Sequence, residues 1–120
     1  MIRTIGLAAA ISLAATGAAL AHAHLVSAEP AADAVVHDKP RQLTLTFSEG
    51  LEAALSGATI TLAGQGEALI GNTTLKEGDG KTLIVPLLAP LGVGTYTVNW
   101  HALSKDGHAT HDSYSFTVAP

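Results

Sequence analysis

Thr95-Tyr96-Thr97-Val98-Asn99-Trp100 is the stretch of sequence that decides the fold. Polar and apolar side chains alternate along it, and this period of two is typical of a β-strand with one face on a core. The tyrosine, the valine and the tryptophan share that face, with the tryptophan expected as the central core aromatic. A second alternating run, residues 113–118, carries two further aromatic residues. The two runs predict two strands that share one core.

Outward from these runs, the remaining chain also has β character. Clusters of Gly, Asn and Asp, such as Gly71-Asn72 and residues 77–80, provide turn chemistry between apolar runs. One stretch is ambiguous, because residues 51–55 would also suit a single helical turn. The further predicted strands are residues 25–26, 42–47, 58–62, 68–70 and 82–87. About seven short strands predict an all-β, immunoglobulin-like sandwich.

The first 21 residues have the features of a secretory signal peptide rather than of a domain. Arg3 precedes an apolar run over residues 5–20 that is short for a membrane span, and Ala19-Leu20-Ala21 matches a cleavage site. We therefore expect an exported protein with one domain, residues 22–120, and no membrane insertion after cleavage. Cleavage after Ala21 makes His22 the new N-terminus, whereas cleavage after Ala23 makes it His24.

Composition limits the chemistry of any site. The formal net charge is −4 with no Lys/Arg cluster, which argues against nucleic acid and against anionic membrane surfaces as partners. There is no cysteine, and the only methionine is Met1, in the predicted leader. A metal ion bound by the exported domain must therefore be held by nitrogen and oxygen donors.

Residues 100–112 carry three histidines and two aspartates. Asp106 and His108 are two residues apart, so an extended backbone would direct both side chains to the same face. An N-terminal His22 would add a chelate of its α-amine and ring Nδ1, and the amine can lose its proton to copper at neutral pH. If the first strand lies beside this loop, the nitrogen and oxygen set favours Cu(II), although zinc accepts the same donors in a tetrahedron.

The other histidines have more ordinary interpretations. His24 is at position three of the predicted mature chain, so a flexible tail alone would bind Cu(II) through the amine, two amides and this ring. Support of the site and simple surface exposure are equally good interpretations of His24. His101, on the face opposite the core by alternation, His111 and His37 are all interpreted as surface or structural residues.

Several stretches form an ordered set: residues 22–27 (His-Ala-His-Leu-Val-Ser), 45–49 (Leu-Thr-Phe-Ser-Glu), 94–100 and Asp106-Gly107-His108. This set resembles the CopC family of periplasmic copper-resistance proteins. The resemblance implies a seven-stranded Greek-key, cupredoxin-like barrel or sandwich and one Cu(II) per chain, held by His22, Asp106 and His108. It also implies Glu49 as a weak or outer ligand. Residues 62–71 contain no methionine, unlike the branch of the family with a methionine-rich Cu(I) loop.

Three classes of function are compatible with these observations. The first is a non-enzymatic periplasmic copper carrier or buffer, which the resemblance would place in copper resistance with delivery to a CopD-type membrane protein. The second is a copper oxidase-type enzyme, because lytic polysaccharide monooxygenases also use an N-terminal histidine chelate. The third is a metal-free immunoglobulin-like interaction domain. We expect the carrier, since so short a chain leaves little surface for a polymer substrate.

Overall fold

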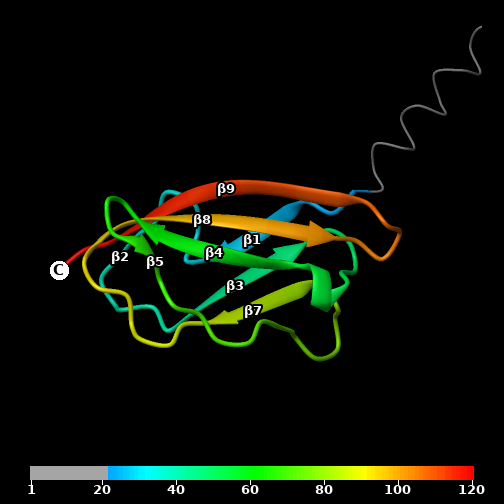
Figure 1. Cartoon of the computed structure of the whole chain (residues 1–120), viewed down its shortest axis with the longest axis horizontal. Helices are drawn as coiled ribbons and strands as arrows, with labels where there is room; N and C mark the ends of the chain where they lie inside the picture. The colour runs from blue at the N-terminus through cyan, green and yellow to red at the C-terminus, as the bar shows by residue number, and fades with distance from the viewer. Residues whose placement is uncertain (1–21) are drawn as a thin grey trace, which may run out of the picture.

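A computed structural model describes residues 22–120 of the chain. The predicted leader, residues 1–21, and with it the cleavage site after Ala21, lie outside the described residues. The described part is a β-sandwich in which two sheets pack face to face (Figure 1). No helix within residues 22–120 has the length and apolar character needed to cross a membrane.

The two sheets contain nine strands, three of them only two residues long. The four-stranded sheet has the order β1 (Leu25–Glu29), β3 (Gln42–Phe47), β7 (Thr82–Pro86) and β6 (Thr74–Leu75). The five-stranded sheet has the order β2 (Val35–Val36), β9 (Ala109–Val118), β8 (Gly94–Leu103), β4 (Gly57–Leu62) and β5 (Gly66–Glu67). All neighbours are antiparallel except β2 and β9.

The core lies between the sheets and uses the alternation seen in the sequence. Tyr96, Val98 and Trp100 of β8 are all buried, as predicted. The Trp100 ring meets Phe47 of the opposite sheet edge-on, with 5.0 Å between ring centroids. This geometry is favourable for an aromatic pair and adds to the burial of both rings. Trp100 is therefore the central core aromatic that the sequence predicts.

The structure confirms the all-β sandwich but corrects several predicted elements. The predicted strand at 68–70 is absent, and Ile70 makes only an isolated bridge to Leu87. The short strands β2, β5 and β6 were not predicted, because two residues give no periodicity. The helical turn in the ambiguous stretch is the 3-10 helix η3 (Ala53–Leu55).

The largest correction concerns the predicted loop after Trp100. Strands β8 and β9 pair without interruption from Gly94↔Val118 to Leu103↔Ala109, so only residues 104–108 form a turn. Asp106 and His108 lie in this turn and not on an extended strand. The hairpin reaches the end of the sandwich at which the described chain begins (Figure 1).

Candidate metal centre

The first described residues are fastened to both sheets. The backbone N–H of His24 donates to Ser48 Oγ at 3.0 Å, and the Ser48 N–H donates to the carbonyl of His24 at 2.9 Å. On the other sheet, the hydroxyl of Thr110 donates to the carbonyl of Ala23 at 2.8 Å. Ala23 is fully buried in the core. Because Ala23 and His24 are both held by these bonds, His22 is directed toward the β8–β9 hairpin.

Ser104 organises that hairpin turn. Its side chain is 1% exposed, and its hydroxyl donates a short hydrogen bond to Asp106 Oδ1 and contacts the His108 carbonyl at 3.2 Å. The Ser104 N–H also donates to the His108 carbonyl at 3.0 Å. Gly107 has φ +92°, a left-handed conformation that glycine adopts without steric cost. The Asp-Gly pair thus makes the turn, and Ser104 holds its two ends together.

Asp106 and His108 approach each other across this turn. Asp106 Oδ1 lies 3.1 Å from His108 Nδ1 and also accepts from the His108 N–H at 3.3 Å. The hydroxyl of Ser104, followed by the His108 ring, holds the pKa of Asp106 below its ordinary value, against an opposing effect of desolvation. The carboxylate is consequently charged at neutral pH, and it orients the imidazole so that Nε2 points away from it.

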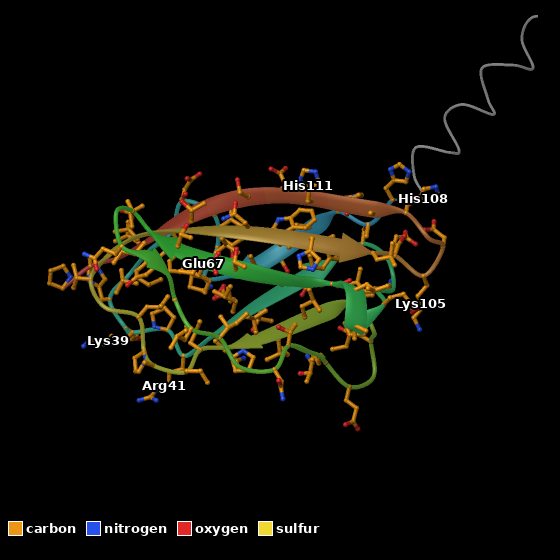
Figure 2. The ribbon with its side chains drawn as sticks, viewed as in Figure 1. Lys39, Arg41, Glu67, Lys105, His108 and His111 are labelled. Carbon is orange, nitrogen blue, oxygen red and sulfur yellow. The ribbon has the colours of Figure 1, made fainter. Side chains whose placement is uncertain are left out.

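The ring of His22 completes this cluster. Its centroid lies 4.5 Å from that of His108, with the two planes tilted by 39°. Figure 2 labels His108 at this end of the sandwich, with His111 farther along β9. Within residues 22–120, no three His, Asp or Glu side chains are already arranged around a common point as metal ligands. Asp106 is turned into the hairpin toward Ser104, and His22 has no free amine while Ala21 precedes it.

Two residues predicted near the cluster lie in different environments. His24 is exposed, and its Nδ1 lies 3.3 Å from both the His22 carbonyl and Ser48 Oγ. Glu49 is half-buried, and among the described residues no hydrogen bond or ion pair links it to His22, Asp106 or His108. The adjacent Ser48 makes the contacts to the N-terminal segment instead. A ligand role for Glu49 stays a prediction.

The structure also identifies residues whose role the sequence did not reveal. Ser104 and Thr110 position the hairpin and the N-terminal segment, yet single hydroxyl residues in a polar stretch have no distinctive signal. His101 and His111, interpreted separately as surface residues, are direct cross-strand partners. A signal for this pair was present, because each of the two histidines is five residues from Asp106, at the centre of the turn.

Comparison with known proteins places this geometry in a family. The sequence model of the CopC domain matches residues 25–119. The chain belongs to the CopC family. The match includes Asp106 and His108, whereas His22 lies just before it. The resemblance noted in the sequence is therefore confirmed for the family and for the β-sandwich fold.

Individual relatives agree with this assignment. The chain is 48% identical over 98 residues to protein YobA of Escherichia coli K12, covering 82% of this chain and 79% of YobA. The crystal structure of CopC from Methylosinus trichosporium OB3b has a TM-score of 0.76 and 31% identity, covering 82% of this chain and 95% of that one. PcoC, a methionine-rich copper resistance protein of Escherichia coli, has a TM-score of 0.74 and 35% identity, covering 82% and 99%.

Proposed function

We propose that this CopC-family chain is an exported Cu(II) carrier or buffer that acts in copper resistance or homeostasis. One Cu(II) ion per chain would be held by the α-amine and ring of His22, by His108 and by Asp106. The observation that carries the proposal is the facing of the His22 and His108 rings, 4.5 Å apart, beside the Asp106 carboxylate. The names of two structural relatives, CopC and a copper resistance protein, support copper as the ion.

Each donor has a distinct part in this proposal. The His22 amine and Nδ1 form a chelate, and chelation raises affinity because the second nitrogen binds intramolecularly. His108 offers Nε2, since Asp106 occupies its Nδ1. A carboxylate on the second ring nitrogen sets the tautomer of a metal-bound histidine. Because Nε2 points away from the carboxylate, Asp106 can bind the same ion only after its side chain rotates away from Nδ1 of His108. Its Oδ2 would then be the donor, since it receives no hydrogen bond from within residues 22–120.

The proposal requires release of the N-terminus before His22. Ala23 is fully buried, and its carbonyl accepts the hydrogen bond of Thr110. Cleavage after Ala23 would remove this buried residue and leave the Thr110 hydroxyl without that partner, whereas cleavage after Ala21 keeps both. We therefore favour cleavage after Ala21, in the periplasm, as the step that creates the chelating amine.

The destination of the copper is part of the proposal. Delivery to a CopD-type membrane protein is supported by the family resemblance alone. A carrier without enzymatic activity suits a cluster at the tip of a hairpin, with His108 and Asp106 half-exposed. An exposed cluster permits direct ligand exchange with a partner protein. The chain has one methionine, at position 1, so we propose no thioether site for Cu(I) in residues 22–120.

A Cu(II) titration of residues 22–120, started at His22, tests the proposal. We expect one tight equivalent that His108→Ala weakens by roughly 10²-fold, because the ring is held in place by the fold. His24→Ala is the matched control and should change the affinity little. If instead His24→Ala abolishes binding and His108→Ala does not, the flexible-tail mode operates and the folded site is wrong.

A further inference from the structure

His101 and His111 form a second cluster outside the proposed copper centre. They are direct partners in the register between the adjacent strands β8 and β9. Both side chains are exposed, while Trp100 and Ala102 on either side of His101 are buried. Opposed residues on neighbouring antiparallel strands have their Cβ atoms about 4.5–5.5 Å apart. Two imidazoles therefore leave the outer face of the five-stranded sheet from adjacent positions.

The surroundings of this pair leave space for an ion. Both histidines line a shallow groove on the sheet, together with oxygen-bearing side chains and no Lys or Arg; the groove residues are Thr59, Asn99, Trp100, His101, His111, Asp112 and Ser113. On the side of β4, the neighbour of His101 is Gly57, whose lack of a side chain gives the ring room. A Cβ placed on Gly57 would lie 3.3 Å from Cε1 of His101.

We propose that His101 and His111 form a second metal site that binds one Cu(II) ion through two imidazole nitrogens. His101 rests over Gly57, so chelation needs a rotation of this exposed side chain from β4 toward β9, between staggered rotamers. Water molecules would fill the remaining positions. Among divalent first-row ions, copper binds such nitrogen ligands most tightly, ahead of nickel and zinc. With two protein donors, the site is weaker than a centre that adds an amine and a carboxylate.

This site is independent of the proposed function. It needs neither the His22 amine nor the ring of His108, which lies in the turn before β9, although His111 also lines a groove with His22 and His24. A chain with both sites would take up a second, more labile copper equivalent when copper is abundant. The outer sheet face would then bind additional copper when the tip site, formed by His22, Asp106 and His108, is already occupied.

The test uses residues 22–120, which contain both sheets and the whole core. His22→Ala, His24→Ala and His108→Ala together disable the proposed tip site and remove the two histidines that line a groove with His111. In this background, Cu(II) alone is titrated by isothermal calorimetry while the histidine resonances are followed by NMR. We expect one equivalent that broadens His101 and His111 together. His101→Ala and His111→Ala should each weaken binding by roughly 10²-fold, the loss of an intramolecular second donor.

His37→Ala is the matched control, because His37 is an exposed histidine bonded at Nδ1 to the Pro120 carbonyl, far from this pair in the sequence. It should leave the second site unchanged. Absence of binding, or loss in only one of the two variants, would overturn the chelate. Equal loss in His37→Ala would show non-specific surface binding and overturn it as well. If the unmodified chain does not bind Cu(II) at the tip site, the binding expected at His101 and His111 is unaffected. The two proposals can therefore be refuted separately.

Discussion

Ser104 is the residue on which the geometry of the tip site depends most. It is buried, yet its hydroxyl contacts both Asp106 and the backbone of His108. Through these contacts one uncharged residue sets the position of a carboxylate and, indirectly, of an imidazole. A hydroxyl that holds ligands in place contributes to affinity without touching the ion, as outer partners do in many metal sites.

Ser104→Ala tests this role. We expect the Cu(II) affinity of residues 22–120 to fall by about tenfold, within the range for loss of an outer hydrogen bond. The unfolding free energy should fall by about 1 kcal/mol, the usual net contribution of one hydrogen bond, since the partners Asp106 and His108 are exposed and can turn to water. Removal of the hydroxyl should also raise the pKa of Asp106 toward its ordinary value. Ser113→Ala, an exposed serine on β9, is the control; equal effects of both variants would contradict the role of Ser104.

At the scale of secondary-structure elements, a few backbone positions determine where a strand begins or ends. Gly94 opens β8 with φ +151°, and a Cβ there would lie 2.6 Å from Leu62 Cδ1 on β4. Such an approach is closer than real Cβ contacts allow, so the Leu62 side chain would have to move aside, and the positive φ adds backbone strain at the start of β8. β8 pairs with β9 along its whole length and with β4 over residues 96–101, so strain at its start falls on the central strand of the five-stranded sheet.

Gly94→Ala is therefore expected to lower the unfolding free energy by about 1–3 kcal/mol, from backbone strain and overpacking. Urea denaturation followed by tryptophan fluorescence measures this, since Trp100 lies in the core on the same strand. Gly92→Ala is the matched control, because nothing lies within 4 Å of its added Cβ. If the urea midpoint of Gly94→Ala equals that of Gly92→Ala, then Leu62 of β4 and the start of β8 accommodate the added methyl group without loss of stability, and this prediction is wrong.

Asp79 closes the loop that leads into β7. Its carboxylate accepts from the backbone N–H groups of Lys81 and Thr82 at 2.9 and 3.2 Å, and from the Thr82 hydroxyl at 2.8 Å. The Lys81 N–H, followed by the Thr82 hydroxyl, lowers the pKa of Asp79. A lowered folded-state pKa means that the charged form stabilises the fold above the unfolded-state pKa. That stability is lost as the pH falls through the folded-state pKa.

Asp79→Asn should accordingly reduce stability at pH 7, and the difference from the unchanged chain should shrink on acidification below about pH 5. Urea midpoints measured from pH 7 into the acid range give this profile. The exposed Asp38, changed to Asn, is the control and should give a small difference at pH 7. A difference for Asp79→Asn that grows in acid would have the wrong sign for this account.

At the scale of the whole molecule, the alternation of polar and apolar residues predicted the main strands of the two sheets better than it predicted where those strands end. Runs with several alternations, such as 42–47 and 95–100, are strands as expected, because burial of one face imposes the period of two. Residues 101–103 and 109–112 mix histidine, threonine and aspartate with alanine and leucine. They hide the extension of β8 and β9, since toward the hairpin turn the pairing continues without a clear alternation of hydrophobicity. An approach of the N-terminal segment to residues 101–112 was expected as a condition of the metal site, but the bond from Thr110 to the Ala23 carbonyl joins positions distant in sequence and could not be predicted.

The candidate site was predicted in its residues but not in its organisation. Asp106 and His108 were grouped for their spacing, and the structure joins them through a turn that Gly107 and Ser104 create. The approach of His22 follows from the packing of the first strand on β3, which no local pattern encodes. The whole molecule thus brings the start of the domain to the tip of its longest hairpin, and this convergence is the basis of the proposed copper carrier.

The most direct measurement is electron paramagnetic resonance of Cu(II) added to two versions of residues 22–120. One version begins at His22, and the other has one extra Gly before it. At one equivalent of Cu(II) per chain, the account predicts a single signal with nitrogen couplings and tight binding in the first version. In the second, the tight signal should be lost, because the α-amine no longer lies next to the His22 ring. Equal spectra and equal affinity in both versions would contradict the account, since His22 would then not anchor the ion.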